Sequence, residues 1–440
     1  MRWHPICIRI LVLTTLTGVL TCPARSQQLS SIDRDNAISM LDNISKEIQK
    51  HYYDAKFHGI DWAATARDAR QKIKSSTSLN MALAHIAQAM VSLNDSHTFF
   101  LPPPRPYIHN YGYQTRMIGE QCFILRVRPG SDAESKGLKA GDELLALDGY
   151  TPHRDTIWKM EYRYNVLRPE PGQTLVLRDP QGQVRKIDIM AKIKTLARVE
   201  DFSHYGIGDY VRRDENEEHL LRARWAEVGD DVGILKIPVF MFDQAEVESM
   251  MSRAGKRPAL ILDLRGNPGG AVDTLKYLVG GLFEKDIKIA DRVGRKESKP
   301  EVAKAWNHGV YTGKLVVLVD SRSASASELL ARIVQLEKRG MVLGDRSSGS
   351  VMEARRYEYT LGQDSMTFYG ASITESDLIM SDGNSLEHHG VTPDELVLPT
   401  AADLAAGRDP VLSRAVTLLG GKLSPEDAGK LFPYEWPKEQ

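Results

Sequence analysis

The sequence predicts an α/β protein with a mainly parallel sheet, preceded by a helical segment. Apolar, strand-like runs recur at residues 259–264, 315–319 and 341–343, and helical patterns such as 243–252 and 274–283 lie between them. Strands that alternate with helices in this way are typical of a parallel sheet, because each parallel connection needs a crossover. A chain of 440 residues is long enough for two or three domains.

Residues 1–26 are typical of a cleaved secretory signal peptide. Two arginines precede an apolar stretch from residue 10 to 20, and small residues follow it, so we expect cleavage before Gln27. Cys22 raises a lipoprotein as the alternative, but the residues before it are a poor context for lipidation. The sequence therefore predicts a periplasmic or secreted protein.

Composition excludes several classes of protein. The formal net charge is −1 and no long basic stretch occurs, which argues against a nucleic-acid partner. No later stretch is long and apolar enough to predict a membrane span. After cleavage Cys122 would be the one remaining cysteine, so no internal disulfide is expected.

A helical region is predicted over residues 27–111. Apolar side chains recur every three or four residues between Ile38 and Tyr52, and two further helices are predicted at 61–73 and 79–93. The run of three prolines at 102–104 then interrupts the helical pattern.

A β-rich domain is predicted over residues 112–198. The segments Val127–Glu134 and Gly137–Gly149 resemble those of a PDZ domain of the permuted bacterial kind. That resemblance implies a domain that binds an extended peptide by strand addition and holds its terminal carboxylate on backbone N–H groups. We expect this cradle at 118–123, with Gly119, Cys122 and Phe123 as peptide-binding residues. The alternative is a small structural β-domain.

The α/β core is predicted over residues 199–400, and short helices are predicted over 401–440. The stretch 199–228 carries many charges without a clear period and is left unassigned, so the first core strand is expected at Val232. The clearest C-terminal helix is 411–419, with an Asp409 cap and Pro410 at its first position.

The segment Ser323–Glu328 places alternating small residues where a buried strand should turn into a helix. One hydroxyl would then lie at a helix N-terminus, where free N–H groups stabilise an anionic oxygen. Such a turn suits a serine nucleophile, although an ordinary serine helix cap remains the alternative. The Gly-rich turn at 263–270 could supply a second oxyanion donor beside it, although a plain tight turn is the other interpretation.

Together these motifs resemble the tail-specific, or C-terminal-processing, serine peptidases. The matching segments are Asp263–Gly270, Ser323–Glu328 and Val342–Gly349. The resemblance implies a crotonase-like catalytic core with an inserted PDZ domain, and Ser325 as the nucleophile. We expect oxyanion donors from the N–H of Ala326 and of Gly269 or Gly270.

One position departs from the Ser/Lys branch of that family. The branch has a lysine general base where this chain has Ser350. The segment that contains Ser96 and His97 resembles instead the tricorn-like branch, and Glu387 matches its fourth member. The resemblance then implies that His97 accepts the proton of Ser325, while Ser96 and Glu387 orient it. Taken alone, His97 would be a surface or capping histidine and Glu387 an exposed loop carboxylate.

Three functions follow from these observations. The first is an exported serine endopeptidase that acts on peptides or proteins and selects chain ends through its PDZ domain. The second is a catalytically inactive binding or scaffold protein on the same fold, which the missing lysine favours. The third is an acyl-CoA enzyme of the crotonase kind, which export disfavours. No cofactor or metal is expected, because the pair His388-His389 has no third ligand at metal-site spacing. The sequence does not indicate the oligomeric state.

Overall fold

The structure is a computed structural model, and it describes residues 29–195, 218–362 and 367–436. The predicted signal peptide lies outside the described residues, as does the first part of the unassigned stretch 199–228. The rest of that stretch forms the short helix α7 (Glu218–Leu221) and the strand β9 (Arg224–Val228).

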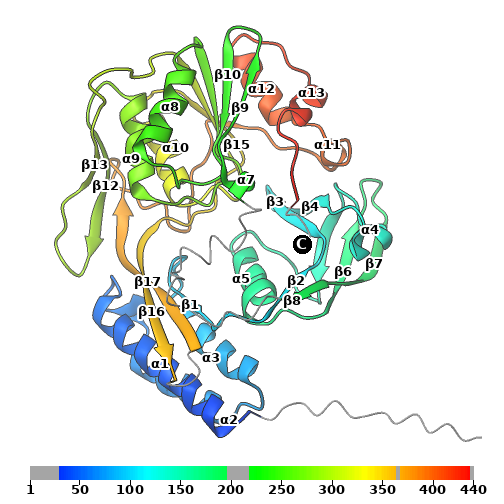
Figure 1. The fold of residues 1–440 in the computed structure, drawn as a ribbon, viewed down its shortest axis with the longest axis vertical. Helices are drawn as coiled ribbons and strands as arrows, with labels where there is room; N and C mark the ends of the chain where they lie inside the picture. The colour runs from blue at the N-terminus through cyan, green and yellow to red at the C-terminus, as the bar shows by residue number, and fades with distance from the viewer. Residues whose placement is uncertain (1–28, 196–217, 363–366, 437–440) are drawn as a thin grey trace, which may run out of the picture.

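The core is a six-stranded sheet in the order β18-β15-β14-β11-β10-β9 (Figure 1). Besides β9, its strands are β10 (Val232–Lys236), β11 (Ala259–Asp263), β14 (Lys314–Val319), β15 (Met341–Gly344) and β18 (Glu395–Leu396). Neighbouring strands pair in parallel, except that β9 is antiparallel to β10. The predicted runs at 259–264, 315–319 and 341–343 are the neighbouring strands β11, β14 and β15, which confirms the predicted parallel sheet.

Helices cover both faces of this sheet because its strands are apolar on both sides. One face packs on α8 (Gln244–Ala254), α9 (Val272–Leu282) and α10 (Ala326–Leu336). The other packs on α12 (Pro410–Leu418). Along β11, Leu260 and Leu262 face the first layer, whereas Ala259 and Ile261 face the second. This two-sided burial explains why the strand reads as a continuous apolar run.

A second sheet joins the N-terminal helices to the core. It contains β1 (Phe99–Leu101), β12 (Ile287–Gly294), β13 (Glu301–Ala303), β16 (Met352–Leu361) and β17 (Thr367–Ile379). The predicted helices are α1 (Ser31–His51), α2 (Trp62–Ser75) and α3 (Leu79–Val91), with the turn η1 (Phe57–Gly59) between the first two. They share one buried cluster with Tyr369, Ala371 and Ile373 of β17, and Figure 1 shows them packed against β16 and β17.

Residues 113–190 form a separate antiparallel sheet in the order β3-β4-β5-β6-β7, here called the β3–β7 unit. Its elements are β3 (Tyr113–Ile118), β4 (Gln121–Val127), α4 (Asp132–Ser135), β5 (Glu143–Leu147), α5 (Ile157–Tyr162), η2 (Arg163–Leu167), β6 (Gly172–Arg178) and β7 (Val184–Met190). The unit has a hydrophobic cluster of its own. The chain enters it along β2 (Tyr107–Asn110) and leaves it along β8 (Lys192–Thr195), and these two strands pair with each other. The unit is therefore inserted between the helical region and the core.

Three short helices end the described chain: α11 (Ala401–Ala405), α12 and α13 (Pro425–Lys430). The Asp409 side chain accepts a hydrogen bond from the Leu412 N–H, and Pro410 occupies the first position of α12. Both details confirm the prediction for this helix. None of the helices in the described part of the chain has the length and apolar character needed to cross a membrane.

Candidate active site

Ser325 lies at the turn between β14 and α10, as the sequence predicts. Its backbone has φ 55° and ψ −120°, a left-handed conformation that costs energy for a residue with a Cβ atom. The turn places Ser325 directly before the N-terminus of α10, where the helix dipole favours developing negative charge.

The two neighbouring serines have structural roles instead. Ser323 and Ser327 are fully buried, whereas Ser325 is partly exposed. Ser323 Oγ donates to the Leu264 carbonyl at 2.9 Å, and Ser327 Oγ donates to the Asn267 carbonyl at 3.0 Å. Both bonds fasten the serine turn to the Gly-rich turn. Of the three serines, Ser325 is thus the one placed to act on a substrate.

The Gly-rich turn lies against Ser325. A Cβ atom added to Gly269 would be 2.7 Å from Ser325 Cβ and 3.0 Å from the Ala326 nitrogen. The Gly269 N–H is already donated to Asn267 Oδ1 at 2.7 Å. Within the described chain the N–H groups of Ala326 and Gly270 donate to no backbone carbonyl. Of the predicted oxyanion donors, Ala326 and Gly270 are therefore available and Gly269 is not.

The structure brings three of the four predicted catalytic side chains into direct contact. Ser96 Oγ lies 2.8 Å from Glu387 Oε2 and 2.7 Å from His97 Nδ1. The Glu387 carboxylate also accepts from the N–H groups of Ser96, at 2.7 Å, and Val351, at 2.8 Å. An ionised Glu387 can only accept, so Ser96 donates to it and in turn accepts from His97 Nδ1–H. In this arrangement His97 Nε2 is left as the basic nitrogen.

Burial sets the ionisation of this cluster. It lowers the pKa of His97 below the ordinary 6.5, and the nearby charge of Asp95 opposes this only in part. Burial raises the pKa of Glu387 above the ordinary 4.5, while the Ser96 and Val351 donors oppose the rise. A neutral His97 is the form that can accept a proton.

Asp95 has a role in this loop that the sequence prediction missed. Its Oδ1 atom accepts hydrogen bonds from the His97 N–H at 3.0 Å, the Thr98 N–H at 2.7 Å and the Thr374 hydroxyl at 2.6 Å. The side chain is buried, and Thr374 lies on β17. Asp95 therefore anchors the Ser96-His97 turn to the second sheet. An aspartate two residues before the histidine is the pattern of an Asx turn, which is the signal that could have indicated this role.

Ser325 is joined to the histidine cluster through the loop at 347–351. The Ser325 N–H donates to the Ser350 carbonyl at 2.9 Å, and the next residue, Val351, donates to Glu387. The Ser350 hydroxyl, at the position where the Ser/Lys branch has lysine, lies 2.9 Å from Ser348 Oγ. Lys338 follows the C-terminal end of α10, about 16 Å from Ser325 by the rise of an 11-residue helix. It cannot act as the base.

The other histidines near the site bind backbone carbonyls. His388 Nε2 lies 2.9 Å from the Asn94 oxygen, and His389 Nδ1 lies 2.7 Å from the Glu387 oxygen. Among the described residues there is no group of three or more His, Cys, Asp or Glu side chains that could hold a metal ion.

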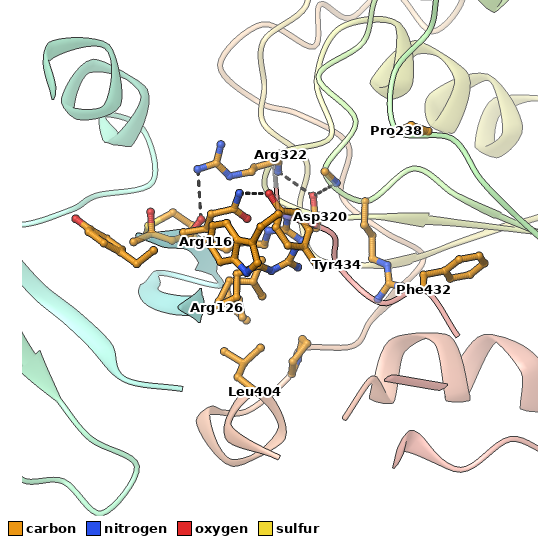
Figure 2. A pocket seen from close by; sticks show the side chains of 18 of the residues that line it. Arg116, Arg126, Pro238, Asp320, Arg322, Leu404, Phe432 and Tyr434 are labelled. Carbon is orange, nitrogen blue, oxygen red and sulfur yellow. Dashed lines mark hydrogen bonds and ion pairs between the residues drawn. The ribbon is translucent and has the colours of Figure 1, made fainter. Parts of the chain in front are cut away.

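A cavity of about 850 Å³ lies between the β3–β7 unit, the core and the C-terminal tail. Its walls include β3, Met160 and Tyr164 of the unit, the Gly-rich turn and Tyr434 of the tail. Figure 2 shows Arg116 pointing toward Asp320, with Arg126 and Tyr434 beside them. Arg116 and Asp320 form an ion pair at 2.5 Å, and the Arg126 guanidinium stacks 3.8 Å from the Tyr434 ring centre.

The segment 118–123, which was predicted to be the carboxylate cradle, is not a free loop. It is the hairpin between β3 and β4, in which Ile118 pairs with Gln121. The Gly119 N–H donates to Asp345 at 3.0 Å, and Cys122 and Phe123 are buried. The Gly119 N–H is thus already bonded to the core, and Cys122 belongs to the buried cluster of the unit. Peptide binding by Gly119, Cys122 and Phe123 stays a prediction.

Comparison with known proteins gives a consistent picture. The model of peptidase family S41 matches residues 231–397. The tail-specific protease of Haemophilus influenzae is 24% identical over 321 residues, which cover 68% of this chain and 43% of that protein. The carboxyl-terminal-processing protease of Picosynechococcus sp. is 26% identical over 371 residues, which cover 80% of both chains. This chain thus spans less than half of the first relative and four fifths of the second.

Among solved structures, mature CPAF is similar in fold. The TM-score is 0.64 at 16% sequence identity, and the match covers 85% of this chain and 95% of that chain. The matched family region contains the Gly-rich turn, Ser325 and Glu387, whereas His97 lies before it. The match to the peptidase family S41 model covers residues 231–397, and the similarity to the two processing proteases indicates a serine-type peptidase.

Proposed function

We propose that this protein hydrolyses peptide bonds with Ser325 as nucleophile and His97 as general base. The observation that carries the proposal is the Ser96–His97–Glu387 hydrogen-bonded cluster, which adjoins the Ser325 turn through residues 350 and 351. The cluster supplies a base where the family's Ser/Lys branch would use lysine. It supports a tricorn-like mechanism for this chain.

In the first half-reaction Ser325 Oγ attacks the substrate carbonyl carbon and its proton passes to His97 Nε2. The resulting oxyanion accepts hydrogen bonds from the N–H groups of Ala326 and Gly270. The C–N bond then breaks, and His97 returns the proton to the leaving amine. In the second half-reaction water attacks the acyl group, His97 takes a proton from that water, and Ser325 leaves as its hydroxyl form. Glu387 stabilises the charged imidazole through Ser96.

We further propose that the β3–β7 unit is a PDZ domain inserted before a crotonase-like core. β3 is at the end of its sheet order and has β4 as its only partner strand in the described chain. An extended peptide can pair with such an edge, but here it would have to replace the Ser321 and Arg322 side chains, which donate to the Met117 and Thr115 carbonyls of β3. The cavity beside β3 is lined by Met160 and Tyr164, which offer apolar contacts to a peptide. We therefore propose that the peptide lies along β3.

The first prediction concerns the nucleophile. Ser325→Ala should lower peptide hydrolysis by roughly 10⁴-fold or more, because the covalent route is lost. It should also abolish labelling by a fluorophosphonate probe, while the circular dichroism spectrum stays unchanged. Hydrolysis by the variant at the wild-type rate would refute Ser325 as the nucleophile, whereas a wild-type protein that the probe does not label would favour the inactive binding protein.

The second prediction concerns the base. Since His97 must be neutral to accept a proton, kcat/KM should rise with pH through an ionisation below 6.5. His97→Ala should lower kcat by about 10²–10⁴-fold, whereas His308→Ala, a change at an exposed loop histidine, should not. Ser350→Lys should not restore activity to the His97→Ala variant. Full activity in His97→Ala would refute the tricorn-like assignment.

The third prediction concerns the peptide groove, measured in the Ser325→Ala background so that the peptide stays intact. Met160→Asp places a charge in an apolar wall and should weaken binding of a fluorescent peptide by about 10-fold or more, on the scale of one buried side chain. Val184→Asp is the matched control, because Val184 is exposed on the opposite edge strand of the same sheet. Equal binding by the two variants would contradict the groove.

The fourth prediction concerns export. We propose that residues 1–26 direct the chain out of the cytoplasm and are then removed. Sequencing the N-terminus of the protein recovered from the producing cells should give Gln27 first. Recovery of the chain with its first 26 residues intact would contradict export by cleavage.

A further inference from the structure

Glu328 is a fully buried carboxylate three residues after Ser325, in the first turn of α10. A carboxylate without water must be compensated by donors or by a cation. No ion pair to Glu328 is formed within the described chain. The groups that contact its carboxylate are instead neutral donors. The proposed mechanism gives this residue no role.

Four hydrogen-bond donors converge on the two oxygens of Glu328. Oε1 accepts from Ser347 Oγ at 2.5 Å and from the Gly349 N–H at 2.8 Å. Oε2 accepts from the N–H groups of Ser325 and Ser350, both at 3.0 Å. Three of the donors belong to the 347–351 loop, and the fourth is the amide of the proposed nucleophile itself.

The same loop is held at its other end by the histidine cluster. Val351, the residue after Ser350, donates its N–H to Glu387, which binds Ser96 and through it His97. The loop is thus held between two carboxylates, Glu328 on the side of the nucleophile and Glu387 on the side of the base. The spacing between nucleophile and base depends on both.

We infer that Glu328 is a positioning residue for catalysis: its carboxylate holds Ser325 and the 347–351 loop in the one geometry that presents Ser325 to His97. This inference rests on the proposed function. The bond to Glu328 also explains why the Ser325 N–H is not an oxyanion donor. The Ser325 N–H is committed to Glu328 and the Ser350 carbonyl, so the oxyanion is left to Ala326 and Gly270.

The four-donor arrangement requires a carboxylate. An ionised Glu has two acceptor oxygens with about four lone-pair sites, whereas a Gln amide offers one acceptor oxygen and an NH₂ group. In Glu328→Gln that NH₂ group would face two N–H or O–H donors, so at least two hydrogen bonds would be lost. Burial raises the pKa of Glu328 to about 7, and the four donors act against this rise.

A purely structural role is the alternative, because Glu at the third helical position commonly caps the helix. The chain contains a matched example of that role. At the start of α8 the exposed Glu246 accepts from the Asp243 N–H at 2.8 Å, and Asp243 accepts from the Glu246 N–H at 2.9 Å. Glu246 caps a helix without any contact to the site, so Glu246→Gln reports the effect of losing a cap alone.

The test compares Glu328→Gln with Glu246→Gln in the full chain. Three quantities are measured: kcat and KM for a quenched fluorescent peptide, the rate of fluorophosphonate labelling of Ser325, and the thermal midpoint. Glu328→Gln should lower kcat and the labelling rate by about 100-fold, the order seen when a group that preorganises an active site is removed. Its KM should stay within about threefold, because the substrate contacts are intact. Glu246→Gln should leave kcat, KM and labelling unchanged.

The outcomes separate the two proposals. If wild-type protein is not labelled and does not hydrolyse peptides, the proposed function fails and the role of Glu328 fails with it. If wild type is labelled and Glu328→Gln is labelled equally fast, only the role of Glu328 is overturned. If Glu328→Gln does not fold, Ser347→Ala decides, since it leaves the carboxylate and removes one of its donors, together with the acceptor of the Val391 N–H. It should lower kcat by about 10-fold at constant KM, and an unchanged kcat would overturn the inference.

Discussion

The Glu387 carboxylate joins two parts of the chain that lie 291 residues apart in sequence. It accepts both the N–H and the hydroxyl of Ser96, and it is itself buried. Because a buried carboxylate is costly without its donors, the Ser96-His97 turn must stay docked on the core. The packing of α1, α2 and α3 against β17 supports the same docking from the other side. The assembly of the site is therefore part of the tertiary fold.

The parallel sheet explains why the remaining pieces meet. β11, β14 and β15 are neighbours that run in the same direction, so the turns that follow them emerge at one edge. These turns carry the Gly-rich segment, Ser325 and the 347–351 loop. The β3–β7 unit contacts the same edge through ion pairs that include Arg116 with Asp320 and Arg154 with Asp345. Asp320 and Asp345 directly follow β14 and β15, so the unit is fastened to the turns that form the site.

Local patterns in the sequence predicted the core strands β10, β11, β14 and β15, the N-terminal helices, the Asp409 cap of α12 and the turn that holds Ser325. They did not predict β12, β13, β16 and β17 of the second sheet. They predicted less where a structure depends on a distant partner. The resemblance to PDZ domains implied a carboxylate cradle at 118–123, but Gly119 lies in a tight hairpin and donates its N–H to Asp345, a residue 226 positions away. Glu328 has the pattern of an ordinary helix cap, and its further donors come from a loop about twenty residues later. Burial and hydrogen bonds from distant residues cannot be inferred from the local sequence pattern.

Ser350 occupies the position where the Ser/Lys branch has its lysine base, so a base must come from another part of the chain. A lysine in the 347–351 loop would lie on the same core as Ser325, and the core alone could supply nucleophile and base. With His97 as the base, the base comes from the N-terminal region, and the bonds of Asp95, Ser96 and Glu387 hold it on the rest of the protein. Loosening that region would move the base without disturbing Ser325. In the proposed mechanism, catalysis is therefore tied to the docking of residues 29–101, a dependence that a Ser/Lys site on the same sheet would not have.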